Sequence, residues 1–309
     1  MVQKNQCVKF LDVGHGDSSI IYFENGKVAI IDIVNVNKML TELATRDIRV
    51  VDLLIISHSD ADHCKGVNDF LQKFNAVGIV KNICFNLDRK QLSSTMKLIL
   101  KKFLEIYRKE HITLLNGQID TSIHKKELLS SDNFKLFLIY PNMSEATEAY
   151  LKNSTNDTSI VCLLESKVCN VIFSGDLEGH GWKNLLERMP KLKCEVLKMP
   201  HHGAYYDKKN GIELRQILDV IQPIDVIISS GENKKYNHPN RLTIELLKEK
   251  NINIYCTEFT HLCHCNANDF DRKCYGDIEI TVGDVSYEIQ TEQKNMTLLS
   301  CAFCQGTVL

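Results

Sequence analysis

The chain has 309 residues, of which 44% are hydrophobic and 25% charged, and its formal net charge is −2. This composition is typical of a globular protein with a full core, and it excludes a disordered or linker-rich chain. A net charge so close to zero gives no bulk attraction toward polyanions, so nucleic acid would have to bind through a local basic groove.

Predicted strands come first along the chain, and strands and helices mix afterwards. Strands are predicted at 8–13, 18–23, 28–33, 50–57, 77–85, 134–140, 158–165, 170–174, 194–199, 226–229, 252–255, 277–282 and 286–290. Helices are predicted at 37–45, 66–74, 93–110, 182–189, 211–221 and 243–250. Because no strict strand–helix–strand repeat appears, we expect an α/β protein in which two sheets pack together with helices outside.

The predicted organisation is one domain over residues 1–309. Residues 86–132 contain no motif and are expected to be an insertion or a cover over the site, and residues 256–304 form a cysteine-rich element. The first nine residues are polar, and the run 10–23 is interrupted by Asp12, His15 and Asp17. We therefore expect neither a signal peptide nor a membrane span, and hence a cytoplasmic protein with no membrane partner.

The strongest chemical signal is the run His58-Ser59-Asp60-Ala61-Asp62-His63, which follows a largely apolar predicted strand. A loop that leaves a strand end can fold these four ligand-type side chains into one pocket. Imidazole together with carboxylate suits zinc, manganese or iron, and more carboxylate favours harder ions such as manganese. A solvated surface loop is the alternative interpretation, but it does not explain why the run directly follows a buried strand.

Three further segments carry side chains of the same types at or near strand ends. Ser174-Gly175-Asp176 follows one predicted strand, and Lys198-Met199-Pro200-His201-His202-Gly203 follows another. Lys235-Tyr236-Asn237-His238-Pro239 supplies a late histidine. Each segment alone has an ordinary explanation: a Gly-Asp turn, one packed and one exposed imidazole, or a loop histidine.

Together, the segments HSDADH, SGD and PHHG resemble the metallo-β-lactamase superfamily. Asp60 stands where that superfamily usually has a second histidine, and this departure, with FLDVGHGD at 10–17 and the late NHP, is similar to the ComEC-like branch of DNA-uptake competence proteins. The resemblance spans about residues 8–289. It implies a four-layered αββα sandwich with two divalent metal ions, zinc or manganese, at one edge of the paired sheets.

The resemblance also implies roles for individual residues. His58 and Asp60 would hold one ion, Asp62 and His63 the other, Asp176 would bridge them, and His202 or His201 would complete the ligand set. Candidate catalytic residues are Asp62, His201 and His238. Residues expected beside the site or against the substrate are Asp12, His15, Asp17, Asn156, Ser159 and Lys198. His15 replaces a glutamine that is usual in the branch.

The resemblance implies a metal-dependent hydrolase, a phosphodiesterase or nuclease that acts on DNA or RNA through a water activated by two metal ions. One alternative is a hydrolase of small phosphodiesters of the phosphorylcholine type, and another is a component of a multi-protein bacterial defence system with partners from its operon. Basic and tyrosine side chains near the late motifs could line a phosphate track or simply form a solvated, packed surface. They are Lys198, Lys208, Lys209, Lys234, Lys235, Arg241, Tyr205, Tyr206 and Tyr236. No oligomeric state is predicted.

The cysteines near the carboxyl terminus form a separate candidate site. Cys256, Cys263, Cys265 and Cys274 are accompanied by His261 and His264, and Cys301 and Cys304 form a CxxC pair. A structural zinc ion, packed thiols and redox pairing all remain open, because the spacings match no standard zinc finger.

Overall fold

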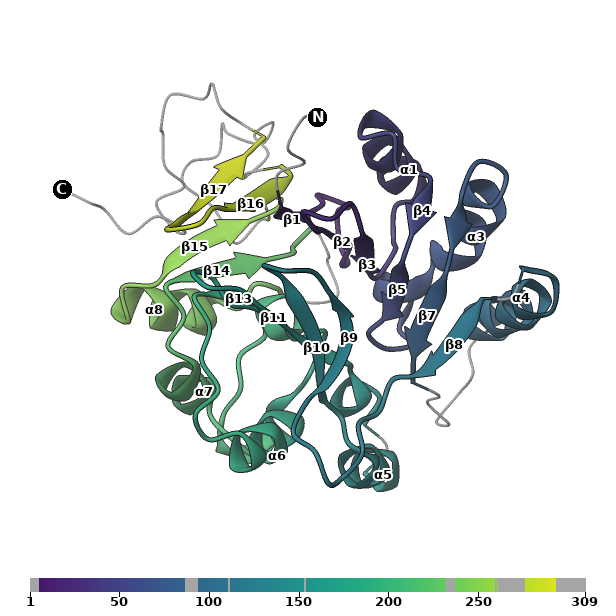
Figure 1. The fold of residues 1–309 in the computed structure, drawn as a ribbon. Helices are drawn as coiled ribbons and strands as arrows, with labels where there is room; N and C mark the ends of the chain where they lie inside the picture. Colours follow the sequence, from purple (N-terminus) through teal and green to yellow (C-terminus); the bar gives the residue numbers. More distant parts are fainter. Residues whose placement is uncertain are drawn as a thin grey trace.

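The computed structural model describes residues 6–86, 94–110, 112–152, 154–231, 237–258, 260 and 276–292. Within these residues the strands form two large sheets, which lie face to face in the centre of Figure 1. The eight-stranded first sheet has the order β17-β16-β1-β2-β3-β5-β7-β8, and the seven-stranded second sheet has the order β15-β14-β13-β12-β11-β10-β9. Each sheet combines antiparallel strands with parallel ones.

The bounds of the strands are as follows. The first sheet contains β1 (Cys7–Phe10), β2 (Ser19–Tyr22), β3 (Val28–Ile31), β5 (Leu53–Ile56), β7 (Asn82–Phe85), β8 (Thr113–Asn116), β16 (Ile278–Val282) and β17 (Tyr287–Thr291). The second contains β9 (Lys126–Ser130), β10 (Lys135–Tyr140), β11 (Val161–Glu165), β12 (Val171–Phe173), β13 (Val196–Lys198), β14 (Asp225–Ile228) and β15 (Asn253–Cys256). A separate two-stranded ribbon pairs β4 (Val50–Val51) with β6 (Ile79–Val80).

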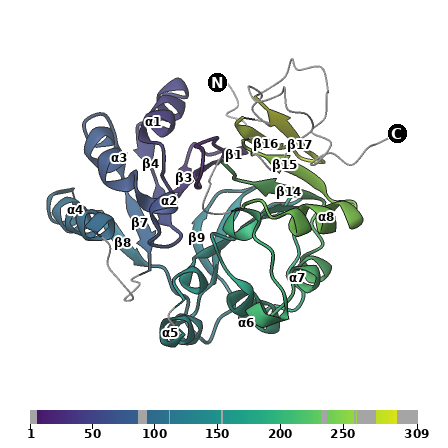
Figure 2. The same ribbon diagram turned by 180° about the vertical axis from the view of Figure 1, so that it is seen from behind.

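Helices cover the outer face of each sheet. Figure 1 shows α1, α3 and α4 on the side of the first sheet and α6, α7 and α8 on the side of the second, and Figure 2 shows the same arrangement from behind. The helices are α1 (Val36–Thr45), α2 (Ala61–Cys64), α3 (Val67–Phe74), α4 (Ser94–Glu110), α5 (Met143–Leu151), α6 (Gly179–Arg188), α7 (Leu214–Ile221) and α8 (Arg241–Glu249). Short 3-10 turns are η1 (Asn156–Thr158), η2 (Pro200–Gly203) and η3 (Lys208–Asn210).

Three apolar clusters fill the three spaces between these four layers. One lies between the sheets and includes Phe10, Phe134 and Phe173. The second joins the first sheet to α1, α3 and α4, and the third joins the second sheet to α6, α7 and α8 around Trp182, which is fully buried. Because every sheet face meets a buried apolar layer, the predicted αββα sandwich is confirmed.

Two predicted strands are each interrupted by a polar residue. The run 50–57 divides at Asp52 into β4 and β5, and the run 77–85 divides at Lys81 into β6 and β7. The Lys81 ammonium lies 2.8 Å from the Asp52 carboxylate, whose other oxygen accepts a hydrogen bond from the amide of Val28. The two breaks therefore coincide in space and set the small ribbon beside the large sheet.

Residues 86–132 supply parts of the layers themselves. The described part of this segment forms α4, whose Met96, Ile99 and Phe103 are buried against the first sheet, together with β8 and β9. Strands β8 and β9 are the edge strands of the two sheets. Among the described residues, no helix has both the length and the apolar character that crossing a bilayer requires.

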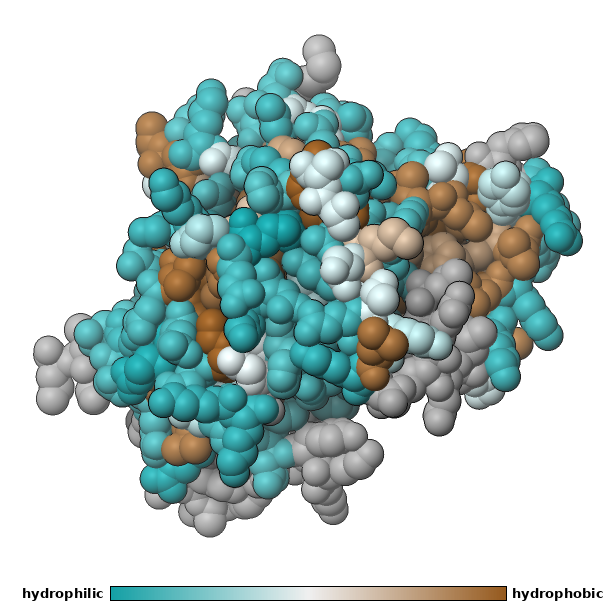
Figure 3. Space-filling model, turned by 90° about the horizontal axis from the view of Figure 1, so that it is seen from below, coloured by the Kyte–Doolittle hydropathy of each residue, from teal (hydrophilic) through white to brown (hydrophobic). Residues whose placement is uncertain are grey.

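The surface seen from below is mainly hydrophilic, with separated apolar patches (Figure 3). The largest patch in this view lies on the side where Figure 1 draws α4 and β8. Apolar side chains that α4 exposes are those of Leu98, Leu104 and Tyr107.

Candidate metal centre

The ends of parallel strands bring the sequence motifs together. His58 lies two residues beyond the end of β5, Asp176 three residues beyond β12, and His202 four residues beyond β13. Strands β12 and β13 are parallel neighbours in the second sheet, so their carboxyl ends meet at one edge. Strand β5 belongs to the facing sheet, so the loops of both sheets contribute to one site.

Asp176 lies at the centre of this site. Its Oδ1 is 3.1 Å from Nε2 of His63, and its Oδ2 is 3.7 Å from Nε2 of His202. Nε2 of His58 and Nε2 of His201 each lie 3.9 Å from the same Oδ2. One buried carboxylate therefore faces four imidazole nitrogens, contributed by segments more than one hundred residues apart.

An unusual backbone conformation sets the direction of both histidine side chains in the PHHG turn. His201 and His202 have φ values of 47° and 52°, in the left-handed region that is costly for residues other than glycine. Such conformations cost on the order of 1–3 kcal/mol each and persist where surrounding contacts enforce them. The amide of His201 donates to the carbonyl of Gly175, which ties the PHHG turn to the SGD turn at 3.2 Å.

A buried carboxylate fixes the ring of His63. Oδ2 of Asp32 accepts a hydrogen bond from Nδ1 of His63 at 2.8 Å, and the same oxygen accepts from the Ser57 hydroxyl at 2.6 Å. The other Asp32 oxygen accepts from the Ser57 amide at 2.7 Å. Because Nδ1 is held by the Asp32 carboxylate, Nε2 is the nitrogen of His63 that is turned toward Asp176 and the site.

The rings of His202 and His58 are oriented in the same way. Nδ1 of His202 lies 2.9 Å from the carbonyl oxygen of Ser229, which can only accept. Nδ1 of His58 lies 3.1 Å from the hydroxyl of Ser57, whose own proton is donated to Asp32. Hydrogen bonding through Nδ1 thus turns Nε2 of all three buried rings toward Asp176.

Five buried atoms of the site have no hydrogen-bond partner among the described residues. They are Nε2 of His58, His63 and His202, and Oδ1 of Asp17 and Asp176. A buried polar atom without a partner costs about 1–3 kcal/mol, so a cluster of five is expected only where another group completes it. Imidazole nitrogens and carboxylate oxygens together are the ligands of zinc or manganese, so these residues fit a divalent cation.

Two groups of ligand atoms are close enough to share an ion. Asp17, His63, Asp176 and His202 each contribute one atom, and these atoms lie within 4.8 Å of one another. A second group, formed by His15, Asp62 and His202, meets the same distance limit. Asp60 is less enclosed: its side chain is 51% exposed, and its Oδ2 lies 3.8 Å from Nε2 of His58.

Burial and neighbouring charges set the protonation of the site. Burial, together with His63, lowers the pKa of His58 to about 3, so this imidazole is neutral at pH 7 and able to bind a cation. Burial also acts to lower the pKa of His63, but the carboxylates of Asp176 and Asp32 outweigh it and hold that pKa above its usual range. The pKa of Asp176 is lowered, because His63 and His202 outweigh the effect of burial.

A buried ion pair lies beneath the ligands. The Lys198 ammonium contacts the Asp17 carboxylate, and both side chains are at least 95% buried. Asp17 Oδ2 also lies 3.6 Å from Nδ1 of His63, and its Oδ1 lies 4.0 Å from Nδ1 of His202. The Lys198 charge, opposed by burial, lowers the pKa of Asp17, so this carboxylate stays ionised beneath the histidines.

The rim of the site is partly exposed. Asp62 Oδ2 lies 3.0 Å from Nε2 of His15, and these side chains are 25% and 21% exposed. His201 is 24% exposed, and its ring centroid is 5.2 Å from that of His238. The centre therefore has a buried floor around Asp176 and an edge that a substrate in solution can reach.

The Asn-x-x-Ser element supports the site from one side. The Ser159 hydroxyl accepts a hydrogen bond from the Asp176 amide at 3.2 Å, and Nδ2 of Asn156 donates to Oε1 of Glu178 at 2.9 Å. The same Glu178 oxygen lies 3.4 Å from Nδ1 of His201. The Asp12 carboxylate accepts a long hydrogen bond of 3.4 Å from the Gly14 amide, within the loop between β1 and β2.

Three residues of this site are absent from the sequence-based prediction: Asp32, Ser57 and Glu178. Asp32 lies one residue beyond β3, and a single acidic residue at the end of an apolar strand was the only available signal for it. Ser57 and Glu178 sit beside predicted ligands, but serine and glutamate at those positions have no distinctive spacing.

Several predicted residues lie elsewhere or outside the described residues. Tyr206 is buried and donates to the carbonyl of Leu177 at 3.1 Å, so it packs in the core and is not available for stacking. Cys256 ends β15 and is buried in the cluster around α6, α7 and α8. The other cysteines proposed for structural zinc, Cys263, Cys265 and Cys274, lie outside the described residues, as do Lys234, Lys235 and Tyr236.

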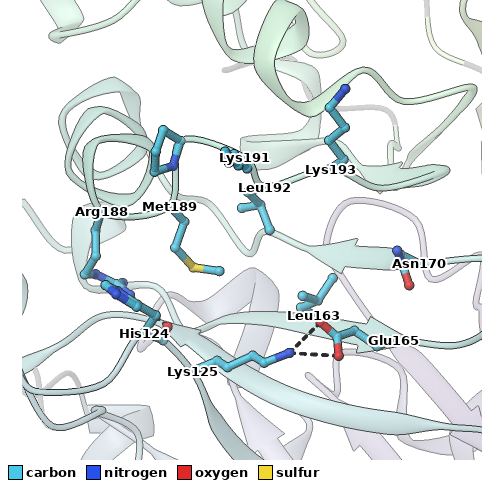
Figure 4. A pocket seen from close by; sticks show the side chains of 11 residues that line it. His124, Lys125, Leu163, Glu165, Asn170, Arg188, Met189, Lys191, Leu192 and Lys193 are labelled. Carbon is cyan, nitrogen blue, oxygen red and sulfur yellow. Dashed lines mark hydrogen bonds and ion pairs between the residues drawn. The ribbon is translucent and has the colours of Figure 1, made fainter.

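A separate cavity of about 480 Å³ opens where α6 ends (Figure 4). Figure 4 shows Lys125 and Glu165 joined across part of it by an ion pair of 2.7 Å, with Arg188 and His124 nearby. Its lining, taken from the described part of the chain, includes none of the candidate metal ligands.

Comparisons with known proteins agree with this geometry. Residues 11–82 match the sequence profile of the Metallo-beta-lactamase superfamily. ComE operon protein 3 of Bacillus subtilis (strain 168) is 24% identical over 216 residues, which cover 70% of this chain. The match covers 24% of that protein, so the chain corresponds to about a quarter of its length.

Solved structures that are similar to the chain include human tRNase Z, short form, with a TM-score of 0.46 and 13% identity, covering 74% of this chain and 94% of that one. CmlA, a diiron beta-hydroxylase from Streptomyces venezuelae, has a TM-score of 0.48 and 13% identity, covering 81% of this chain and 52% of that one. The layered architecture, the convergent motifs and the matched profile together show that this chain has the metallo-β-lactamase fold and resembles the ComEC-like branch, as its motifs indicate.

Proposed function

We propose that the chain is a metal-dependent hydrolase of phosphodiester bonds, a nuclease or phosphodiesterase that acts on DNA or RNA. The observation that carries this proposal is the convergence of three imidazole nitrogens and two carboxylate oxygens, all buried and without hydrogen bonds among the described residues. Two divalent ions, zinc or manganese, would supply the charge that makes a water molecule acidic and neutralises phosphoryl oxygens.

The proposed ligand set is the one that the motifs imply. His58 with Asp60, 3.8 Å apart, would hold one ion, and Asp62 with His63 would hold the other. Asp176 faces both groups, and His202 lies within 3.7 Å of Asp176 and 3.5 Å of Asp62. These distances favour His202 as the ligand in the proposal, and His201, whose Nδ1 lies 3.4 Å from Glu178, is assigned to the substrate.

His201 and His238 would act on the substrate at the rim. Glu178 and Asn156 hold the Nδ1 side of His201, so Nε2 is the atom that can donate a hydrogen bond to phosphate or a proton to the leaving oxygen. Lys208 and Arg241, which follow the PHHG and NHP segments, are exposed and pair with Glu213 and Glu245, and they would exchange these partners for further phosphates. A polymeric substrate with several phosphates would use these charges better than a small ester.

The decisive experiment measures hydrolysis with the metal-free protein and after addition of Mn²⁺ or Zn²⁺. Substrates are single- and double-stranded DNA, RNA and bis-p-nitrophenyl phosphate. We expect cleavage that depends on metal and is abolished in Asp62→Ala and in His63→Ala. The matched control is Asp69→Ala, which removes an exposed carboxylate of α3 and should leave the rate unchanged.

The outcomes separate the alternatives. Cleavage of bis-p-nitrophenyl phosphate alone would replace the nuclease proposal by a small-molecule phosphodiesterase. Full activity in both variants after chelation would show that the assigned residues are not the site. If the protein binds metal but cleaves none of these substrates, the proposed reaction is wrong, although the assignment of the metal centre is still supported.

A further inference from the structure

We infer that His15 is a metal ligand, which binds a divalent cation at the outer edge of the centre together with Asp62 and His202. The inference rests on the proposed metal centre, but it is independent of which bond the protein cleaves. His15 lies in the loop between β1 and β2, so the inference makes this loop part of the ligand set. His15 and His202 would then share with Asp62 the ion that is assigned to this carboxylate.

The distances place the three ligand atoms around one point. Nε2 of His15 lies 3.0 Å from Oδ2 of Asp62, and Nε2 of His202 lies 3.5 Å from the same oxygen. All three atoms lie within 4.8 Å of one another, and the two imidazole ring centroids are 4.9 Å apart. A set of two imidazoles and one carboxylate is typical of zinc sites that keep one position open for water or substrate.

A hydrogen bond between His15 and Asp62 would account for these two residues but not for His202. Nε2 of His202 also faces Asp62, is buried, and has no hydrogen-bond partner in the described structure. Its Nδ1 is already held by the carbonyl of Ser229. A cation bound by all three residues would satisfy His202 and Asp62 together.

The loop that carries His15 is held against the backbone of its neighbours. A Cβ atom on Gly16 would lie 2.4 Å from the Asp62 carbonyl oxygen, and the Asp17 amide donates to that oxygen at 3.0 Å. On the other side, a Cβ atom on Gly231 would lie 2.2 Å from the His15 amide nitrogen. Close packing on both sides fixes the position of His15 before an ion binds.

The two ions should differ in how far they depend on His15. His15 contacts Asp62, which is assigned to one ion, whereas the other ion is assigned to His58 and Asp60. Loss of His15 should therefore affect one metal equivalent and leave the other one bound.

The test titrates Co²⁺ into the metal-free full chain and follows the visible absorption of the bound ion, with stoichiometry from equilibrium dialysis and elemental analysis. The variants are His15→Gln and His15→Ala. Glutamine can still donate a hydrogen bond to Asp62 but is a poor metal ligand, so it separates the two roles. The matched control is His124→Gln, an exposed histidine of the separate cavity in Figure 4.

We expect the unaltered chain and His124→Gln to bind two equivalents. In both His15 variants the dissociation constant of one equivalent should rise at least tenfold, with an altered absorption spectrum, and that of the other equivalent should be unchanged. Metal-free melting temperatures equal to that of the unaltered chain would show that the variants fold.

Other results would overturn the inference. If His15→Gln binds both equivalents as tightly as the unaltered chain, His15 only orients Asp62 through a hydrogen bond. If both equivalents weaken equally, His15 supports the whole site and is not a ligand of one ion. If the unaltered chain binds no Co²⁺, the proposed metal centre fails together with the role of His15, a result distinct from failure of His15 alone.

Discussion

Nδ1 of His63 lies 2.8 Å from Oδ2 of Asp32, and both side chains are almost completely buried. This carboxylate decides which nitrogen of the imidazole carries the proton, and so it decides that Nε2 faces Asp176. The pair joins the end of β3 to helix α2, two elements that the chain places about thirty residues apart. Asp32 thus orients His63 as a metal ligand and does not bind the ion itself.

Replacing Asp32 by asparagine keeps the shape of the side chain but removes its charge. An amide nitrogen placed beside Nδ1 would favour the other imidazole tautomer and so block Nε2. We expect Asp32→Asn to weaken metal binding by about 10- to 100-fold, the usual effect of losing a carboxylate that orients a metal-bound histidine. Equilibrium dialysis with Mn²⁺ or Zn²⁺ measures this change, and unaltered affinity with a normal melting temperature would contradict it.

The buried pair of Lys198 and Asp17 gives a prediction for stability. Lys198→Met leaves the Asp17 carboxylate buried without its main counter-charge, which typically costs about 3–5 kcal/mol. Urea unfolding of the metal-free protein measures the loss. The control Lys191→Met removes an exposed lysine and should change the free energy of unfolding by no more than about 0.5 kcal/mol.

A double variant separates the charge from the packing of this pair. Combining Lys198→Met with Asp17→Asn removes both charges, so we expect the double variant to be more stable than Lys198→Met alone. If the second change adds a further loss, the effect of Lys198 comes from packing and not from its charge.

Much of the site can be predicted from the sequence because its ligands follow strands. HSDADH, SGD and PHHG each come soon after an apolar run, and the carboxyl ends of parallel strands gather at one edge of a sheet. The structure brings His58, His63, Asp176 and His202 together in this way. Local patterns were sufficient here because each motif contains several ligand-type residues side by side.

Asp32 and Glu178 could not be found by the same reasoning. Each is a single acidic residue whose partner is distant in the sequence, and the pairing of strands within one sheet brings the partners together, β3 with β5 for Asp32 and β12 with β13 for Glu178. Similarly, α5, β8 and β9 were absent from the predicted elements, and the breaks at Asp52 and Lys81 were missed. Each of those two residues is a single charge within an apolar run, and their ion pair becomes visible only when β4 and β6 lie side by side.

Glu178 provides a test of the role of His201. Glu178→Gln keeps a group that can accept from His201 but removes the charge that supports its imidazolium form. We expect kcat to fall by about 10- to 100-fold, part of the roughly 10²–10⁴-fold that a positioned proton donor contributes. Metal content should be unchanged. Glu187→Gln, on the exposed side of α6, is the control. Equal kcat values in the two variants would show that His201 does not act as the proton donor.

The last prediction concerns Gly16, which has a φ of 133° and lies against the backbone of Asp62. Gly16→Ala should destabilise the protein on the order of 3 kcal/mol, because the backbone conformation suits only glycine and the new methyl group meets the Asp62 carbonyl. Gly26→Ala is the matched control: its φ is 83°, but nothing lies within 4 Å of the added atom. Backbone strain alone should cost about 1 kcal/mol there. Equal losses of unfolding free energy in the two variants would mean that the loop is not clamped against Asp62, and the fixed position of His15 would then need another cause.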